Sequence, residues 1–365
     1  LRSAVYQLKY MDSVPDSAVC NEAVKLAVKK GFGTLRGFVN GVLRNVARGL
    51  DQVEYPAEGI ERLSVVYSMP EWILKLWKKT YDLDVIESML QAFQEETPVT
   101  IRCNLAKTTP ENLKESLQKE GVTVTPHPYL SYAFWIQDYD HLSELESFQK
   151  GEFYVQDISS MLVGELADPK KGDRVIDVCA APGGKALHVA EKLRGTGSVE
   201  ARDLSLYKVG LITENIERSG LTNIHAVQKD ATVCDADVKD AADLVIADLP
   251  CSGLGVLAKK TDLKYKATEQ GTKELAGLQR EILKNAASYV RPGGTLIYST
   301  CTINPAENIE NVHWFLKEFP EFVLDPIADR LCSTLQNSVE EAGCLQLLPG
   351  IHKSDGFFIA RFGKK

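Results

Sequence analysis

Apolar side chains between residues 4 and 46 recur every three or four positions, in three separate runs. This spacing is typical of one face of an α-helix. Pro15 separates the first two runs, and residues 51–59 around Pro56 have the composition of a linker. We therefore predict an all-helical domain at residues 1–55.

Residues 56–150 mix the helical period with short strand-like runs. A helix between strands, with little other regular sequence, is typical of a small α+β domain. Pro110 fits the first turn of one of the helices. The predicted helices are residues 71–77, 85–93 and 109–121, and the predicted strands are residues 99–104, 122–124 and 134–136.

The third region, residues 151–365, alternates apolar strand-like runs with helical ones. Strands that alternate with helices predict a parallel sheet covered on both faces, which is a Rossmann-like α/β domain. Two further runs near the C-terminus, residues 345–348 and 357–361, predict a hairpin. The other predicted strands are residues 174–179, 198–202, 224–227, 244–247 and 295–299.

Composition narrows the class of protein. Hydrophobic residues make up 44% and charged residues 25% of the chain, as in ordinary globular proteins. No apolar run approaches the roughly 20 residues that span a bilayer. The eight cysteines form no CxxC pair and the six histidines no paired spacing, so we expect no metal site. We expect a cytoplasmic monomer with reduced thiols, and the non-Met start suggests a fragment.

The net charge of −8 does not by itself suggest a nucleic-acid partner. Residues 1–50, however, carry eight Lys or Arg against three Asp or Glu. We therefore expect phosphate contacts in this region, with Arg36, Arg44 and Arg48 as candidates. The lysines of residues 259–266 either hold phosphate over an active site or lie in a solvated loop.

A glycine-containing turn follows the first strand of the third region. Residues 179–185 (CAAPGGK) close a buried strand and open a helix, where α/β sheets bind ligands. GxGxxG is absent, which disfavours a dinucleotide. Asp203 and Asp230 follow the next two strands, at positions suited to a ribose and an adenine. Together these features predict a nucleoside-containing cofactor.

Two cysteines end the next two predicted strands. Cys251 follows Asp248 in residues 248–253 (DLPCSG), and Cys301 follows residues 295–299. A lone free cysteine is usually a small buried apolar residue. Near Cys301, however, Asn304 and Glu307 flank a predicted helix start with Pro305 at its first position, which would favour a thiolate. Cys301 is therefore a candidate nucleophile.

Methylation of cytosine at carbon 5 would use these groups together. Addition of a thiolate to carbon 6 makes carbon 5 nucleophilic, and a carboxylic acid such as Asp248 can protonate N3. After methylation, a base must remove the proton from carbon 5 so that the thiol leaves. Cys251, or a water near it, suits that step.

The three motifs, in this order and spacing, resemble those of the RNA cytosine-C5 methyltransferases related to the bacterial Sun protein. The resemblance implies that S-adenosylmethionine is the cofactor, that Cys301 is the nucleophile and that Cys251 assists product release, with Asp248 in the catalytic set. The implied cofactor-binding residues are Cys179, Ala180, Ala181, Pro182, Gly183, Gly184, Lys185, Asp203, Asp230 and Asp248.

Residues 16–48 resemble the helical NusB-like domain of the bacterial small-subunit enzymes, with its first helices missing. This likeness implies 16S ribosomal RNA as the partner and cytosine 967 as the target. The alternatives are a cytosine-C5 methyltransferase for tRNA or another RNA, and a non-catalytic RNA-binding protein. A DNA enzyme is disfavoured because its nucleophile is the Pro-Cys cysteine, and a dehydrogenase because the third glycine is missing.

Overall fold

The computed structural model describes residues 1–365 apart from the side chain of Glu340. The chain forms two compact units, Leu1–Val66 and Tyr67–Lys365. Within the described part of the chain, we find no helix with the length and apolar character that a bilayer span requires. The three-domain division predicted from the sequence stays a prediction.

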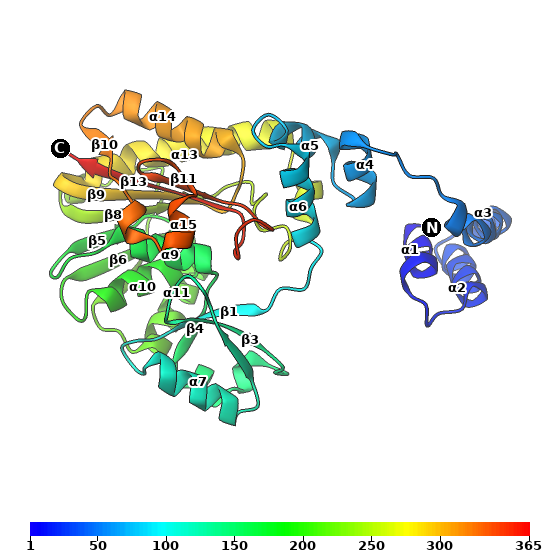
Figure 1. Ribbon diagram of the computed structural model, residues 1–365, viewed down its shortest axis with the longest axis horizontal. Coiled ribbons are helices and arrows are strands. Elements are labelled where there is room, and N and C mark those ends of the chain that lie inside the picture. Colours follow the sequence, from blue (N-terminus) through cyan, green and yellow to red (C-terminus); the bar gives the residue numbers. More distant parts are fainter. The chain divides into compact units, whose positions relative to one another are not determined.

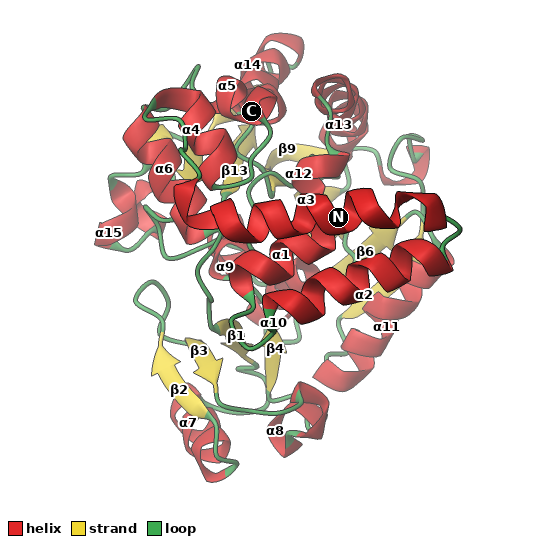
Figure 2. Ribbon diagram, turned by 90° about the vertical axis from the view of Figure 1, so that its right-hand side faces the viewer, coloured by secondary structure: helices red, strands yellow, loops and turns green.

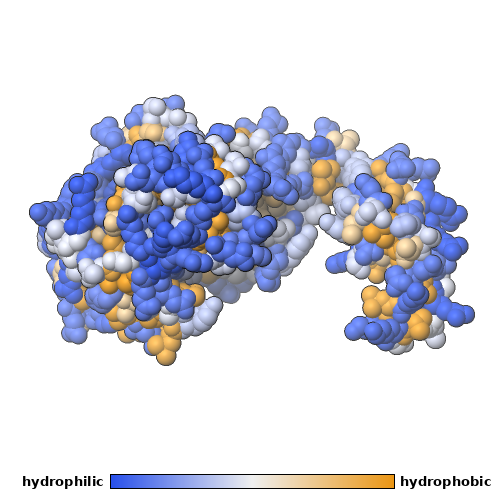
Figure 3. Space-filling view, turned by 90° about the horizontal axis from the view of Figure 1, so that it is seen from below, coloured by the Kyte–Doolittle hydropathy of each residue, from blue (hydrophilic) through white to orange (hydrophobic). Residues whose placement is uncertain are grey.

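The first unit is all-helical, as the apolar spacing predicted. Three helices lie side by side (Figure 2) around a small core that includes Val19, Val39 and Leu43. Several large apolar side chains remain exposed on them, among them Tyr6 and Phe38, and apolar atoms show on the surface of this unit in Figure 3. Its helices are α1 (Arg2–Tyr10), α2 (Asp16–Lys29), α3 (Arg36–Gly49) and α4 (Gly59–Val66).

The second unit begins with two helices and a small antiparallel sheet, which confirms the predicted α+β character. The strand order is β2-β3-β1-β4, and α7 covers one face (Figure 1) through Leu113 and Leu117. Thr109 caps α7 by accepting from the N–H of Asn112 at 3.2 Å. The elements are α5 (Glu71–Trp77), α6 (Leu83–Ala92), β1 (Val99–Cys103), α7 (Pro110–Lys119), β2 (Thr123–Pro126), β3 (Ala133–Gln137), α8 (Glu146–Gln149) and β4 (Phe153–Val155).

The large sheet of the second unit has nine strands. Its order is β11-β12-β13-β9-β8-β5-β6-β7, and β10 pairs with β13. β7, β6, β5, β8 and β9 run parallel, and the C-terminal strands are antiparallel, including the predicted hairpin of β12 and β13. The strands are β5 (Arg174–Asp177), β6 (Ser198–Asp203), β7 (Ile224–Gln228), β8 (Ala242–Asp248), β9 (Val290–Thr300), β10 (Phe322–Leu324), β11 (Val339–Glu341), β12 (Cys344–Leu347) and β13 (Phe357–Lys364).

Helices cover both faces of this sheet (Figure 1), which confirms the Rossmann-like α/β fold. One apolar cluster joins the sheet to α9 and α10 through Met161 and Leu187. A second joins it to α13 and α14 through Leu283 and Phe315. The helices are α9 (Ile158–Ala167), α10 (Gly184–Lys192), α11 (Leu206–Ser219), α12 (Leu263–Lys266), α13 (Glu269–Tyr289), α14 (Ile309–Glu318) and α15 (Ser333–Gln336).

Strand order places the predicted motifs together. From β5 the chain continues to β6 and β7 on one side, and then crosses to β8 and β9 on the other. The carboxyl ends of β5 and β8 therefore form a topological switch point, the usual ligand site of such sheets. Asp177 ends β5, Asp203 ends β6 and Asp248 ends β8, while Cys301 follows β9 directly.

Candidate active site

A cavity of about 330 Å³ lies at these strand ends. It brings together residues from all three motifs with Asp203 and Asp230, as the sequence predicted for neighbouring parallel strands. Both candidate cysteines and three predicted carboxylates face it. Its lining includes Cys179, Ala181, Asp203, Leu204, Asp230, Asp248, Cys251, Leu278, Ile282 and Cys301.

The turn after β5 is held by backbone hydrogen bonds to the end of β6. Ala180 N–H donates to the Arg202 carbonyl at 2.7 Å, and Ala181 N–H donates to the Asp203 carboxylate at 3.1 Å. Gly183 has a φ of +107° where α10 begins, a conformation that side chains other than glycine rarely adopt. Ala180, Pro182, Gly183, Gly184 and Lys185 shape this turn and the start of α10, and they do not line the cavity.

The cavity fits the nucleoside cofactor expected from the sequence. Asp203 and Asp230 present carboxylates, which can accept hydrogen bonds from ribose hydroxyls or a base amino group. Leu278 and Ile282 supply apolar surface for a flat base. Hydrogen bonds from the side chain and backbone of Thr232 lower the pKa of Asp230, so its carboxylate is ionised.

The two cysteine thiols are in direct contact. Cys251 Sγ and Cys301 Sγ lie 3.2 Å apart, although the residues are fifty positions apart in the chain. The hydrogen bond with Cys251 lowers the pKa of Cys301, and burial raises it by a smaller amount. The pKa of Cys301 therefore lies below its ordinary value. The same hydrogen bond, together with burial, raises the pKa of Cys251 well above its ordinary value. Of the two, Cys301 is therefore the thiol that loses its proton more readily.

Lys185 and Asp248 form an ion pair beside the thiols. The Lys185 ammonium lies 2.8 Å from the Asp248 carboxylate and donates to Ser160 Oγ at 3.2 Å. Burial opposes the charge of Lys185, but the attraction of Asp248 and Asp177 raises its pKa above the ordinary value. Ser299 Oγ–H donates to Asp248 at 2.7 Å. The sequence predicted both charged residues but gave no sign that they pair.

Glu307 has a function different from the predicted one. The sequence predicted an α-helix start at Pro305, but residues 305–307 form one 3-10 turn, and α14 begins at Ile309. Asn304 still caps that turn through Ala306 N–H. The fully buried Glu307 carboxylate accepts from Ser252 N–H at 2.8 Å instead. Glu307 thus holds the loop after Cys251, and the contact with Cys251 lowers the pKa of Cys301.

The basic candidates have separate environments. Lys259 forms ion pairs with Asp157 and Asp355 at 2.8 and 2.7 Å, so its charge is already engaged within the protein. Arg36, Arg44 and Arg48 are exposed on α3. Among the described residues, no cluster of three or more metal-ligating side chains is present.

Three family models match parts of the chain. A family model described as 16S rRNA methyltransferase RsmB/F matches residues 165–363. The NusB family model matches residues 1–48, and the ferredoxin-like domain of RsmF/B-like methyltransferases matches residues 69–139.

Individual relatives cover most or all of the chain. It is 38% identical over 368 residues to a probable ribosomal RNA small subunit methyltransferase B of Bacillus subtilis, covering 100% of this chain and 82% of that protein. Identity to a ribosomal RNA small subunit methyltransferase F of Klebsiella pneumoniae is 34% over 285 residues, covering 76% and 60%. The structure of NSun6 from Pyrococcus horikoshii with SFG superposes with a TM-score of 0.72 at 25% identity, covering 82% and 99%.

Proposed function

Because the chain belongs to the 16S rRNA methyltransferase RsmB/F family, we propose that it methylates carbon 5 of a cytosine in 16S ribosomal RNA through a covalent Cys301 adduct. The coarser activity follows from the family: the protein is an S-adenosylmethionine-dependent ribosomal RNA methyltransferase. The observation that supports methylation of cytosine through a cysteine adduct is the contact of two thiols. They lie 3.2 Å apart in a cavity that is also lined by Asp248.

We propose that the cofactor is held by the predicted set of residues at the ends of β5, β6, β7 and β8. In this proposal Asp203 and Asp230 hold the nucleoside, while Cys179 and Ala181 form the adjoining wall. The remaining predicted residues, from Ala180 to Lys185, fix the turn. When bound, S-adenosylmethionine supplies the methyl group as an electrophile.

Cys301 begins the proposed reaction as a thiolate that adds to carbon 6 of the cytosine. Addition places negative charge in the ring, and a proton at N3 neutralises it. Asp248 accepts a hydrogen bond from the Lys185 ammonium at 2.8 Å. This pair therefore holds a proton that Asp248 can pass to N3 as the carbon–sulfur bond forms.

Cys251 acts after the methyl group is in place. Its pKa is raised mainly by its hydrogen bond to Cys301 and by burial. Once the Cys301 sulfur is bonded to carbon 6, it carries no negative charge, so the pKa of Cys251 falls. Cys251 can then lose its proton to water and remove the proton on carbon 5. Cys301 leaves as a thiolate, and the N3 proton returns to Asp248.

The proposed target is cytosine 967 of 16S ribosomal RNA. The NusB match at residues 1–48 supports it, because the methyltransferase B relative aligns with all of this chain. The methyltransferase F relative aligns with 76% of it. We propose that residues 1–55 and 56–150 are RNA-binding domains that select this target for the catalytic domain at 151–365.

The test is methyl transfer from labelled S-adenosylmethionine to unmodified 16S ribosomal RNA and, separately, to bulk tRNA. The RNA is then digested to nucleosides, and the labelled position is mapped. We expect 5-methylcytidine at position 967 of ribosomal RNA alone. Label in tRNA would overturn the substrate, and a different nucleoside would overturn the chemistry. Cys301→Ala is the control: it should abolish transfer and leave cofactor binding intact.

A further inference from the structure

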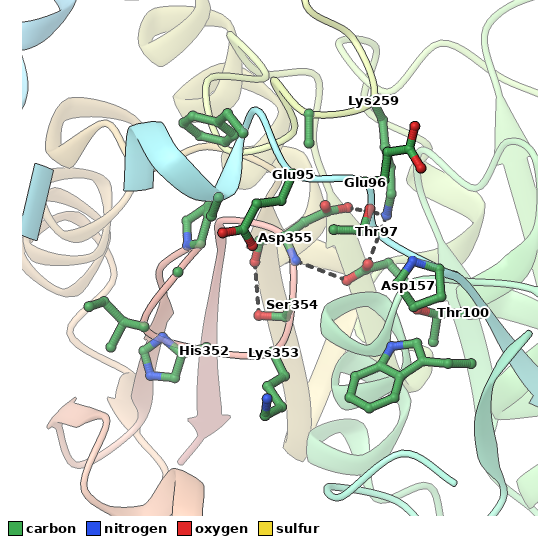
Figure 4. A pocket seen from close by; sticks show the side chains of 18 residues that line it. Glu95, Glu96, Thr97, Thr100, Asp157, Lys259, His352, Lys353, Ser354 and Asp355 are labelled. Carbon is green, nitrogen blue, oxygen red and sulfur yellow. Dashed lines mark hydrogen bonds and ion pairs between the residues drawn. The ribbon is translucent and has the colours of Figure 1, made fainter. Parts of the chain in front are cut away.

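A second cavity, of about 450 Å³, lies in the second unit and shares no lining residue with the catalytic cavity. It is enclosed by several parts of the chain (Figure 4): residues 92–98 at the end of α6 and after it, Thr100 and Trp135 of the small sheet, Asp157 before α9, and two loops at residues 258–259 and 349–355. It therefore lies where the small sheet and the large domain meet within one compact unit.

Three charged side chains form one side of this cavity. Lys259 lies 2.8 Å from Asp157 and 2.7 Å from Asp355. The two carboxyl groups are about 15% and 14% exposed. Asp157 also caps α9 by accepting from Ser159 N–H at 3.0 Å. One ammonium between two carboxyl groups leaves this side with hydrogen-bond acceptors in excess.

The indole of Trp135 also lines this cavity. Trp135 is half-buried on β3 and packs against the ring of His127, with centroids 4.4 Å apart. His127 also contacts the Lys353 carbonyl at 3.1 Å, and Lys353 N–H donates to the Tyr129 hydroxyl at 3.2 Å. These contacts fix the indole as a rigid surface beside the cavity.

Glu95 and Glu96 add two exposed carboxylates to the lining. Within the part of the chain that the structure describes, neither has an ion-pair partner. The lining thus carries four carboxyl groups (Glu95, Glu96, Asp157 and Asp355) against the two ammonium groups of Lys259 and Lys353, a balance that disfavours phosphate. An indole beside carboxyl acceptors suits a nucleobase instead. Aromatic side chains stack on unpaired bases, and Asp or Glu accepts from the exocyclic amino group of a base.

The cavity is joined to the catalytic site through two shared loops. Gly255 N–H donates to the Cys301 carbonyl at 3.1 Å, and the Gly255 carbonyl accepts from Gly356 N–H at 2.9 Å. Lys259 lies four residues after Gly255, and Asp355 directly precedes Gly356. A base bound in this cavity would thus contact the same two loops that hold the backbone at Cys301 in place.

We propose that this cavity binds the base of a nucleotide neighbouring the target cytosine, stacked on Trp135 with its amino N–H groups directed at the carboxylates. The inference rests on the proposed function for the identity of the target. It specifies a base that carries an amino group, namely guanine, adenine or cytosine. Uracil has no amino group, and its one Watson–Crick donor, N3–H, lies between two carbonyl oxygens, so it should bind more weakly.

The test is a double-mutant cycle between protein and RNA. Short RNAs containing the target cytosine carry an abasic nucleotide at one neighbouring position, 5′ or 3′, and the Kd is measured for the wild type and Trp135→Ala. We expect each single change to weaken binding about 10-fold. At one of the two positions, the abasic RNA with the Trp135→Ala protein should bind about 10-fold more weakly than the intact pair. The second change then adds no further loss, because the first has already removed the stacking contact. Additive losses, about 100-fold at both positions, would overturn the proposal.

Two further variants keep the test decisive if Trp135→Ala is poorly folded. Trp135→Phe should retain the Kd but lose the quenching of tryptophan fluorescence by RNA, whereas Trp314→Phe, on α14, should keep that quenching. In Glu95→Gln/Glu96→Gln, the preference against a uridine neighbour should shrink. If that variant instead bound all RNAs more tightly by the same factor, with the same preference against a uridine neighbour, Glu95 and Glu96 would only repel RNA. That result would overturn the proposal.

These readouts separate the subsite from the proposed reaction. The Kd cycle needs no turnover, so coupling at Trp135 stands or fails whatever nucleoside is formed. If the intact RNA yields 5-methylcytidine but the cycle is additive, the subsite alone fails. If coupling is found but label appears in another nucleoside, the proposed cytosine chemistry alone fails.

Discussion

Cys251 Sγ and Cys301 Sγ lie 3.2 Å apart, within hydrogen-bond distance of each other. The contact gives the two chemically identical groups opposite properties, because it lowers the pKa of Cys301 and raises that of Cys251. A pair of this kind can share one proton, and the proposed roles of Cys301 as nucleophile and Cys251 as later base rest on this difference in pKa.

The pH dependence of adduct formation should reveal this contact. The thiolate is the reactive form, so the rate rises as pH rises through the pKa of Cys301, which lies below the ordinary 9.0. Cys251→Ala removes the donor and should move the rise about one pH unit higher. Cys251→Ser retains a donor and should shift it less. Equal profiles for all three proteins would contradict the assignment.

Cys251→Ala should also trap the reaction. If Cys251 removes the proton from carbon 5, the variant adds to RNA but cannot release it. A denaturing gel should then show protein covalently attached to labelled RNA, with multiple turnover reduced at least about 100-fold. Cys234→Ala, an exposed cysteine, is the matched control and should form no lasting adduct. Normal turnover without an adduct would remove Cys251 from the mechanism.

Much of the fold follows from apolar spacing because β5 and β8 are buried on both faces and helices alternate with them. Observed limits differ from predicted ones by a few residues: β5 ends at Asp177 rather than 179, and β9 extends over Val290–Thr300 rather than 295–299. In β9 the added residues include Pro292 and two glycines, which local propensity assigns to a turn.

Pairings between distant residues could not be predicted. Glu307 contacts Ser252, fifty-five positions away, and Lys259 contacts Asp157, one hundred and two positions away. Each residue taken alone resembles a helix cap or a solvated charge, and only the closed fold brings its partner near. The sequence could place side chains at a common sheet edge, but it could not tell which of them touch.

Lys185→Gln should separate the lysine's part in proton transfer from cofactor binding. Lys185 contacts Asp248 but does not line the cofactor cavity. We expect single-turnover methylation to fall about 100-fold with the Kd for S-adenosylhomocysteine changed less than about threefold. Loss of cofactor affinity with normal single-turnover rates would instead assign Lys185 to the cofactor.

Asp177 should make stability depend on pH. Burial, and then the charge of Asp248, raises its pKa to about 7 in the folded chain, against about 3.9 when unfolded. Its stabilising contribution is thus present below pH 4 and is lost as pH rises through about 7. Asp177→Asn keeps an acceptor for Cys179 N–H. From pH 5 to pH 8 the free energy of unfolding of the wild type should fall relative to that of this variant, by on the order of 2 kcal/mol.

Urea unfolding at the two pH values measures that difference. Asp237→Asn, at an exposed acid, is the matched control and should show the same pH dependence as the wild type. An Asp177→Asn variant with no relative gain at pH 8 would mean that the Asp177 carboxyl group is ionised without cost in the folded chain.

The backbone contact between Gly255 and Gly356 should be necessary for catalysis. A Cβ at Gly255 would lie 2.0 Å from the Gly356 carbonyl oxygen, and a backbone atom cannot rotate aside. Gly255→Ala should therefore displace the loop between Cys251 and Lys259, cost about 1–3 kcal/mol of unfolding free energy and slow adduct formation more than tenfold. Gly277→Ala, on α13 with open space around its Cβ, should stabilise the protein slightly and leave adduct formation unchanged. If Gly255→Ala loses stability but reacts at the normal rate, the two loops need not touch for Cys301 to reach its substrate.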